Sequence, residues 1–248
     1  MKYMGSKTKI AKEIVPIIQK YIDKNNIEYY IEPFCGGANV IDKVVCRTKI
    51  ASDINKYLIA LLKEVDRIDI LPNSVTKEHY AEVRKEYRGR NENRQYEDWY
   101  IGAIGFLASY NGRFFDGGYA GIVKTKIGTV RNYYEEAKKN LLLQKDNLKG
   151  ITFINCDYRK WSEVRDALIY CDPPYKNVKQ YGENKEFNHE EFWKWCEKVS
   201  EKNIVIVSEQ EAPESFEVIW KKEVKRTIDN KKGVKATEKL FVYAGGKR

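Results

Sequence analysis

The chain has 248 residues, in which 45 Lys and Arg outnumber 36 Asp and Glu to give a formal net charge of +9, and it contains 18 Tyr and 5 Trp. This length fits one large α/β domain, or one domain with a smaller inserted one. Positive charge with many stacking rings favours a nucleic-acid partner, with an ordinary solvated surface as the alternative. The composition excludes a membrane-spanning helix, because no stretch approaches ~20 apolar residues, and two His without a His/Cys cluster argue against a zinc site.

The first predicted element is a helix over residues 5–22, whose apolar positions recur at helical spacing. Ser6 is its predicted N-cap, and Pro16 lies inside it, where proline kinks a helix. Tyr3 and Lys7 stand at either end of the glycine-containing entry to this helix. The segment is therefore either a lip that faces a ligand or a frayed terminus before a capped helix.

A strand is predicted over residues 29–34, followed by Gly36-Gly37 and a helix with apolar positions at 40–45. A strand, a glycine pair and a helix start form a Rossmann-type entry, where the backbone approaches a ligand because no Cβ intrudes. The G-x-G-x-x-G pattern is absent, so a pyrophosphate is not the expected ligand. The next strand ends at Asp53, an acid placed to accept ribose hydroxyls, to cap the following helix, or to do both.

Between residues 72 and 147 the alternation of strand and helix lapses. Three helices are predicted there, over residues 76–87, 95–110 and 131–145. They flank a glycine- and aromatic-rich segment that carries Arg113, with Lys124 and Lys126 just after it. Cations and rings on a loop suit base edges and phosphates, so the region is predicted either to bind nucleic acid or to be an ordinary insertion.

The α/β pattern then returns. Strands are predicted over residues 151–154, 168–171 and 204–208, a helix around 192–199, and a C-terminal hairpin from 216–220 and 239–243. The second of these strands runs into Asp172-Pro173-Pro174-Tyr175, a rigid turn because proline fixes φ and cannot donate to a ladder. The turn suits a flat heterocycle bearing an amino group: a carboxylate and a prolyl carbonyl accept its N–H bonds, and the tyrosine ring stacks on it. An ordinary strand-ending turn is the alternative, and these residues leave open which amine is bound.

Taken in order, these motifs resemble the Dam-type (D12 class) DNA adenine-N6 methyltransferases. The resemblance spans nearly the whole chain and rests on Tyr3-x-Gly5-x-Lys7, Glu32-Pro33-Phe34-Cys35-Gly36-Gly37, Asp53, Tyr110-Asn111-Gly112, Asp157 and Asp172-Pro173-Pro174-Tyr175. It implies an α/β fold: a Rossmann-like S-adenosylmethionine-dependent methyltransferase sheet with an antiparallel last strand, and an inserted, mainly helical target-recognition region. The implied catalytic domain comprises residues 1–71 and 148–248, and the DNA-binding insertion comprises residues 72–147.

The resemblance also implies roles for single residues in catalysis and cofactor binding. The cofactor, S-adenosylmethionine, would contact Tyr3, Lys7, Glu32, Phe34, Gly36, Asp53, Asp157 and Asp172. Within this set Asp53 would bind the ribose hydroxyls and Asp157 the adenine amine of the cofactor. The catalytic set would be Asp172, Pro173, Pro174 and Tyr175, with Asp172 between cofactor and target and Tyr175 stacked on the flipped adenine.

The implied DNA-binding residues lie in the insertion. They are Tyr110, Asn111, Arg113, Lys124 and Lys126. Tyr110 and Asn111 would enter the duplex where the base leaves it, and Arg113 would read a guanine. Arg113 follows the Asn-Gly pair more closely than in the Dam pattern, so recognition of GATC is not predicted.

The predicted function is site-specific methyl transfer to the N6 amine of a flipped adenine in double-stranded DNA, without a metal. Transfer to N4 of cytosine and a catalytically silent DNA-binding protein on the same fold are the alternatives. A cognate restriction nuclease is left open as a second partner, and the chain is expected to be a monomer or a weak dimer. The start of the chain lacks the apolar block of a signal peptide and the five cysteines form no C-x-x-C pair, so we expect a cytoplasmic protein with reduced thiols and no membrane partner.

Overall fold

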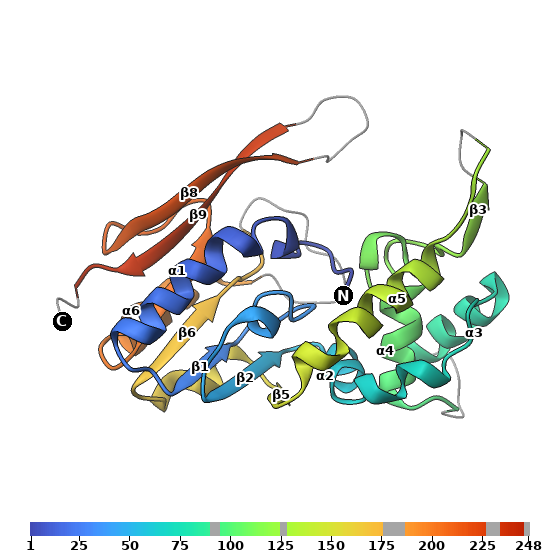
Figure 1. The fold of residues 1–248 in the computed structure, drawn as a ribbon, viewed down its shortest axis with the longest axis horizontal. Helices are drawn as coiled ribbons and strands as arrows, with labels where there is room; N and C mark the ends of the chain where they lie inside the picture. Colours follow the sequence, from blue (N-terminus) through green and yellow to red (C-terminus); the bar gives the residue numbers. More distant parts are fainter. Residues whose placement is uncertain (90–94, 125–127, 176–186, 227–233, 246–248) are drawn as a thin grey trace.

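The computed structural model describes residues 1–89, 95–124, 128–175, 187–226 and 234–245. In this part of the chain the main sheet has seven strands in the order β5-β2-β1-β6-β7-β9-β8 (Figure 1). Five strands are parallel: β1 (Tyr29–Glu32), β2 (Thr48–Asp53), β5 (Ile151–Asn155), β6 (Ala167–Cys171) and β7 (Ile204–Glu209). β9 (Val234–Tyr243) pairs antiparallel with β7, and β8 (Phe216–Arg226) completes the edge. The predicted Rossmann-like sheet with an antiparallel last strand is confirmed.

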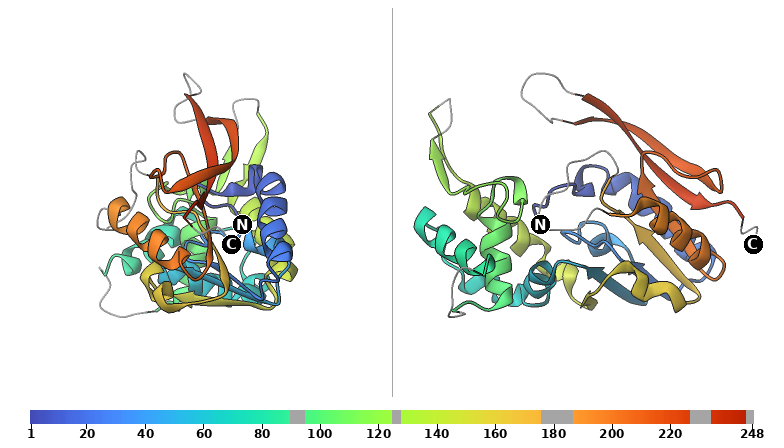
Figure 2. Two further views of the ribbon diagram at one scale, coloured as in Figure 1. Left: turned by 90° about the vertical axis from the view of Figure 1, so that its left-hand side faces the viewer. Right: turned by 180° about the vertical axis from the view of Figure 1, so that it is seen from behind.

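The sheet lies between helices. The strand β6 reads Ala-Leu-Ile-Tyr-Cys and is buried at every position, as expected of a central parallel strand covered on both faces. Helix α1 (Ala11–Lys24) covers one face, and α6 (His189–Ser200) covers the opposite face (Figures 1 and 2). Each of these helices buries one apolar stripe and exposes its charged side.

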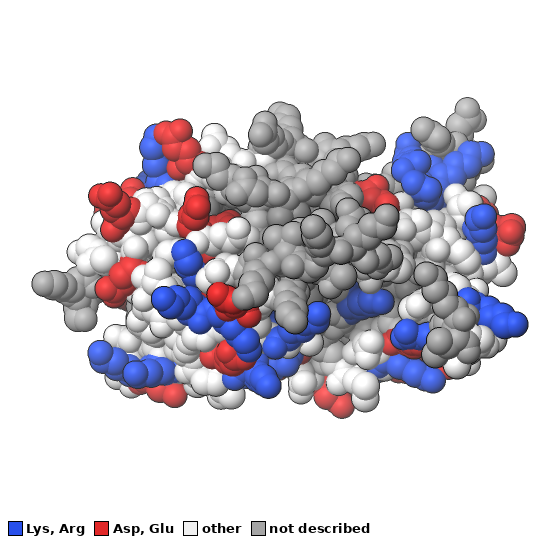
Figure 3. Space-filling view, turned by 90° about the horizontal axis from the view of Figure 1, so that it is seen from above, with Lys and Arg blue, Asp and Glu red and all other residues white. Residues whose placement is uncertain are grey.

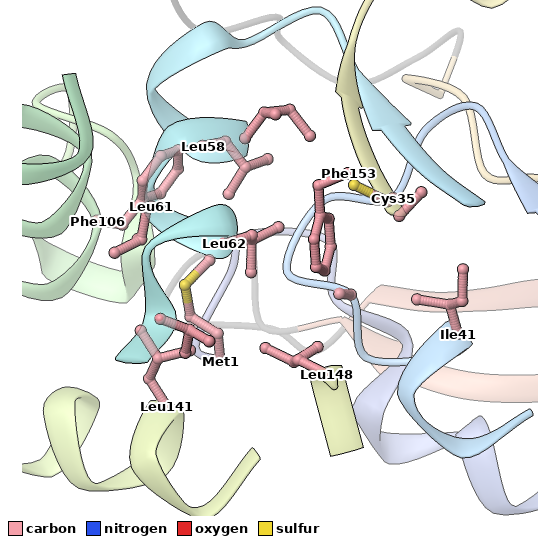
Figure 4. Close-up of a cluster of buried hydrophobic side chains, with 14 of the residues drawn as sticks. Met1, Cys35, Ile41, Leu58, Leu61, Leu62, Phe106, Leu141, Leu148 and Phe153 are labelled. Carbon is pink, nitrogen blue, oxygen red and sulfur yellow. The ribbon is translucent and has the colours of Figure 1, made fainter. Parts of the chain in front are cut away.

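The segment between α2 (Lys56–Lys63) and β5 is mainly helical, as predicted. It contains α3 (Lys77–Tyr87), α4 (Asp98–Leu107), α5 (Tyr133–Leu148) and a small hairpin of β3 (Ile122–Lys124) and β4 (Val130–Asn132). Short 3-10 helices complete the described chain: η1 (Lys7–Lys9), η2 (Ile41–Lys43), η3 (Val65–Ile70), η4 (Tyr110–Gly112) and η5 (Tyr158–Glu163). Phe106 of α4 and Leu141 of α5 belong to the same apolar cluster as Leu61 of α2 and the N-terminal Met1 (Figure 4). The inserted helices therefore share one apolar core with the sheet.

The predicted helix after the first strand is wrong. Only the 3-10 helix η2 forms there, and Val45 is 75% exposed. The side chain of Gln144, from α5, donates to the carbonyls of Gly37 (3.1 Å) and Ala38 (3.0 Å). The Ala38 carbonyl also accepts from the Asp42 amide at 3.4 Å. A side chain more than 100 positions away in the sequence therefore ties the loop before η2 to α5.

The predicted N-terminal helix forms as two pieces. Ser6 caps η1 and accepts a hydrogen bond from the Thr8 amide at 3.2 Å, whereas α1 begins only at Ala11. Pro16 lies within α1. The break between the pieces lets the side chain of Lys7 turn inward, where the residue is only 8% exposed.

Two global expectations concern the cysteines and the membrane. All five cysteines are free, and Cys35, Cys171 and Cys196 are buried. Within the described residues, none of the helices has the length and apolar character needed to cross a membrane.

Candidate active site

Functional side chains are expected where the order of the sheet reverses. The chain runs from β1 outward to β2, then returns to β6 and β7 on the other side of β1. The carboxyl ends of β1 and β6 therefore border the topological switch point, where open α/β sheets bind ligands. Glu32, Asp53, Asp172 and Glu209 end β1, β2, β6 and β7 or directly follow them. The fold thus brings four carboxyl groups to one edge of the sheet.

The glycine loop after β1 receives the N-terminal segment of the chain. Gly36 has φ +47°, and a Cβ built on it would lie 2.8 Å from the ring of Tyr3. Burial raises the pKa of the Tyr3 hydroxyl, and the carboxylates of Asp53 and Asp172 reinforce the shift. Tyr3 therefore lies over the glycine loop and near both acids.

Asp53 is tied to the same loop. One carboxylate oxygen accepts from the Gly36 amide at 3.2 Å and the other from the Asn55 amide at 3.0 Å. Burial outweighs these bonds and raises the pKa of the carboxyl. The adjoining helix α2 is capped by Asn55 rather than by Asp53, because the Asn55 side chain accepts from the Tyr57 and Leu58 amides.

An aromatic cluster borders the site beside β5. The ring of Phe34 stacks on that of Tyr158 at 5.4 Å between centroids and meets Phe187 and Phe192 edge to face. Asp157 caps η5 and accepts from the Arg159 guanidinium at 2.7 Å. Partial burial of Asp157 opposes ionisation, but its bonds from Arg159 outweigh this effect and lower the pKa of the carboxyl.

Glu32 is turned into the protein interior. It is 3% exposed and accepts a hydrogen bond from the Tyr30 hydroxyl at 2.7 Å. Burial, reinforced by the charges of Asp42 and Asp172, outweighs the Tyr30 bond and raises the pKa of Glu32 to about 8. The carboxyl is therefore largely protonated at neutral pH.

This shifted pKa predicts a pH dependence of stability. The Glu32 carboxyl has a pKa of about 8 in the folded chain, against an ordinary value of 4.5, so it holds its proton more tightly when the chain is folded. Its contribution to stability is complete below the lower value and is lost as pH rises through the higher one. We expect Glu32→Gln to lose less unfolding free energy than the wild type across this window, measured by urea denaturation at several pH values. Glu28→Gln, on the surface just before β1, is the control, and parallel curves for Glu32→Gln and the wild type would refute the assignment.

Lys7 and Asp172 meet at the end of β6. The ammonium group of Lys7 donates to Oδ1 of Asp172 at 2.7 Å and lies 4.7 Å from the ring centroid of Tyr175. Burial alone would lower the pKa of Lys7, but the neighbouring carboxylates reverse the effect and raise it. The predicted cofactor residue Lys7 is thus in direct contact with the predicted catalytic turn, in which Pro173 is buried and Pro174 exposed.

Two buried acids beside this turn were missed by the sequence prediction. Glu238 of β9 is 7% exposed and accepts a short hydrogen bond from the Tyr175 hydroxyl, and it lies 3.8 Å from the Lys7 ammonium. Glu209, at the end of β7, is 5% exposed, and its Oε2 has no hydrogen-bond partner within the described residues. Burial raises the pKa of Glu209 to about 7. The sequence held one signal for Glu238. It lies two positions before the apolar Leu240, so both side chains are on the buried face of β9.

The predicted DNA-binding residues separate into two places. Tyr110 is 51% exposed, and Asn111 has φ 56° in an exposed turn. The turn contacts the N-terminal segment, because a Cβ on the following Gly112 would lie 2.5 Å from the Lys2 carbonyl oxygen. Arg113 is half-buried just after this turn. The second place is the β3–β4 hairpin, where Lys124 is exposed, and Lys126 lies outside the described residues.

Comparison with known proteins identifies the family of the chain. A family model described as D12 class N6 adenine-specific DNA methyltransferase matches residues 3–231. The type II methyltransferase M.MjaIII of Methanocaldococcus jannaschii is 30% identical over 199 residues, which cover 71% of this chain and 68% of that protein. A DNA adenine methylase of Haemophilus influenzae is 26% identical over 197 residues, which cover 73% of this chain and 64% of that protein.

Among solved structures, the rRNA methyltransferase aviRa from Streptomyces viridochromogenes aligns with 98% of this chain and 87% of its own, at 11% identity and a TM-score of 0.46. The family model covers most of the chain, including the glycine loop, Asp53, Asp157 and the Asp172 turn. The chain belongs to the D12 class N6 adenine-specific DNA methyltransferases.

Proposed function

We propose that the chain transfers a methyl group from S-adenosylmethionine to the N6 amine of an adenine flipped out of double-stranded DNA. The observation that carries the proposal is the turn after β6, where Asp172 and Tyr175 stand together beside the switch point of the sheet. A duplex base cannot reach such a site without leaving the stack, so flipping is part of the reaction.

The residues at the ends of β1 and β2 fit the cofactor. Each oxygen of the Asp53 carboxylate accepts one backbone amide, which leaves acceptor capacity for the two ribose hydroxyls of a nucleoside. Tyr3 and Gly36 would line the adjoining part of the site. Glu32, which the sequence placed in contact with the cofactor, is turned inward and would support the glycine loop from beneath. Phe34 and Asp157 would hold the adenine, with Asp157 accepting from its amine. When bound, the cofactor would supply an already activated methyl group, so the contribution of the protein is placement and charge stabilisation.

Removal of the Asp53 carboxylate tests this cofactor site. We expect Asp53→Ala to weaken S-adenosylmethionine binding by about 10- to 100-fold, because hydrogen bonds to a charged group contribute roughly 1.5–3 kcal/mol. Isothermal titration calorimetry measures the change. Asp146→Ala, at an exposed aspartate paired with Lys149, is the control and should bind as the wild type does. Unchanged affinity in Asp53→Ala would remove Asp53 from the site.

The turn after β6 would act on the target amine. Adenine N6 is a poor nucleophile because its lone pair is delocalised into the ring. Asp172 and the Pro173 carbonyl would accept its two N–H bonds, which favours a tetrahedral nitrogen and stabilises positive charge as it develops. Tyr175 would stack on the base, and Lys7 would orient the Asp172 carboxylate through the 2.7 Å contact.

The inserted region would read the DNA. We assign residues 72–147 to target recognition and residues 1–71 and 148–248 to catalysis. Tyr110 and Asn111 project from an exposed turn, so they suit entry into the duplex where the base leaves it. Arg113 would read a guanine, and Lys124 and Lys126 would contact the backbone. Seen from above, the end of the molecule that carries the insertion shows more Lys and Arg than Asp and Glu (Figure 3).

Single-molecule sequencing of DNA from cells that express the chain tests the function directly. A new N6-methyladenine in one short motif is the expected result, and it would define the recognition site at once. An N4-methylcytosine mark, or no mark of either kind, would contradict the proposal. We propose that the chain acts in the cytoplasm, where it would methylate host DNA. The sequencing result does not depend on whether a cognate restriction nuclease accompanies it.

A further inference from the structure

A buried acid on the C-terminal hairpin contacts the catalytic turn. Glu238 lies on β9, two strands away from β6, and its carboxylate accepts a hydrogen bond from the Tyr175 hydroxyl. The Ser208 hydroxyl, from the intervening strand β7, lies 3.4 Å from the same tyrosine oxygen. The Tyr175 hydroxyl is therefore held by groups from β7 and β9, the next two strands beyond β6.

The same carboxylate also lies near the cation of the site. Glu238 Oε2 is 3.8 Å from the Lys7 ammonium, which is bonded to Asp172. Glu238 and Lys7 have side chains only 10% and 8% exposed. An acid taken out of water in this way destabilises the fold unless it is paired, and a well-packed apolar residue at position 238 would avoid that cost. A role for Glu238 in the reaction would explain why a buried acid, rather than an apolar residue, occupies this position.

We propose that Glu238 is a positioning residue for methyl transfer, which fixes the ring of Tyr175 through its hydroxyl so that the target base stacks in the reactive orientation. The inference rests on the proposed function and adds a residue to it. A tyrosine ring tethered only at Cβ turns about its terminal torsion, which has a broad energy minimum. A hydrogen bond at the far end of the ring fixes its plane. Small misplacement of reacting groups lowers rates by up to about a hundredfold.

Four variants separate positioning from mere stability. Glu238→Ala removes the acceptor, whereas Glu238→Gln keeps an amide oxygen that accepts the Tyr175 hydroxyl. Tyr175→Phe removes the donor, and the double variant Glu238→Ala/Tyr175→Phe tests whether the two act together. Thr237→Ala, at the preceding position of β9, is the control because adjacent strand residues face opposite sides of the sheet.

Two measurements apply to each variant. The single-turnover methylation rate is measured on a duplex carrying the motif found by sequencing, together with the fluorescence of 2-aminopurine in place of the target adenine. In the variants that keep Tyr175, the ¹⁹F signal of 3-fluorotyrosine incorporated at that position reports the state of the ring without requiring any activity.

The expected result is a rate about tenfold to a hundredfold lower in Glu238→Ala, with changed 2-aminopurine and ¹⁹F signals. Glu238→Gln should keep most of the wild-type rate. The double variant Glu238→Ala/Tyr175→Phe should methylate at nearly the same rate as Tyr175→Phe alone. A wild-type rate in Glu238→Ala, no rescue by Gln, or independent effects in the double variant would overturn the inference. A wild type that methylates no DNA would instead refute the proposed function, while the ¹⁹F signal would still show whether Glu238 holds the ring.

Discussion

Asp172→Ala is expected to abolish methyl transfer while the chain stays folded. The carboxylate would orient the target amine and face the positive charge that develops on it. Loss of one preorganised group of this kind lowers kcat by about 10²- to 10³-fold. Because Asp172 would supply both effects, we expect a decrease of at least about 1000-fold in the single-turnover rate. Lys7, which loses its main partner, still has Glu238 at 3.8 Å, so the variant should retain a cooperative unfolding transition.

The matched control for Asp172 lies at the other end of the same strand. Asp166 precedes β6, is exposed and has φ 55°, a conformation that asparagine tolerates. Asp166→Asn should therefore methylate DNA at the wild-type rate. DNA affinity, measured by fluorescence anisotropy, should change little in either variant because most of the proposed DNA contacts lie in the insertion. Retained turnover in Asp172→Ala would refute the mechanism.

Much of the fold could be predicted because local patterns and topology agree in the parallel sheet. The apolar run before Asp172 forms β6, and the strand before Asp53 forms β2. Acids that follow parallel strands reach the same edge of the sheet whatever the details of packing. This rule is why the sequence could group Asp53 and Asp172 before the structure was known.

The prediction failed where contacts join segments that are distant in the sequence. Apolar spacing after Gly37 favours a helix, but only η2 forms there, after a loop whose Gly37 and Ala38 carbonyls accept from Gln144 of α5. Glu238 was missed because its place depends on the pairing of β9 with β7, which joins segments about thirty residues apart. The contact of Gln144 leaves no periodic signal in the sequence. The spacing of Glu238 and Leu240 places both on one face of a strand, but it does not show which strand β9 pairs with.

The contact between the insertion and the N-terminal segment predicts the second large effect. Gly112 is buried with φ +65°, and a Cβ there would lie 2.5 Å from the Lys2 carbonyl oxygen and 3.2 Å from the Tyr3 Cα. Since both neighbours are backbone atoms, the segment itself must move to admit the methyl group. That segment carries Tyr3 and Lys7, so the displacement should reach the cofactor loop and Asp172. We expect Gly112→Ala to destabilise the chain by roughly 2–4 kcal/mol, through overpacking and a left-handed alanine, and to lower the methylation rate.

A second glycine of the same loop separates the two causes. Gly118 has φ +73°, and a Cβ added to it meets nothing within 4 Å. Gly118→Ala therefore carries the conformational cost of about 1 kcal/mol without the collision. Urea denaturation should show the larger loss in Gly112→Ala, and only that variant should bind S-adenosylmethionine more weakly and methylate more slowly. Equal losses in the two variants would mean that the turn and the N-terminal segment do not support each other. If only Gly112→Ala loses cofactor affinity and methylation rate, the proposed DNA-binding turn also supports the structure of the active site.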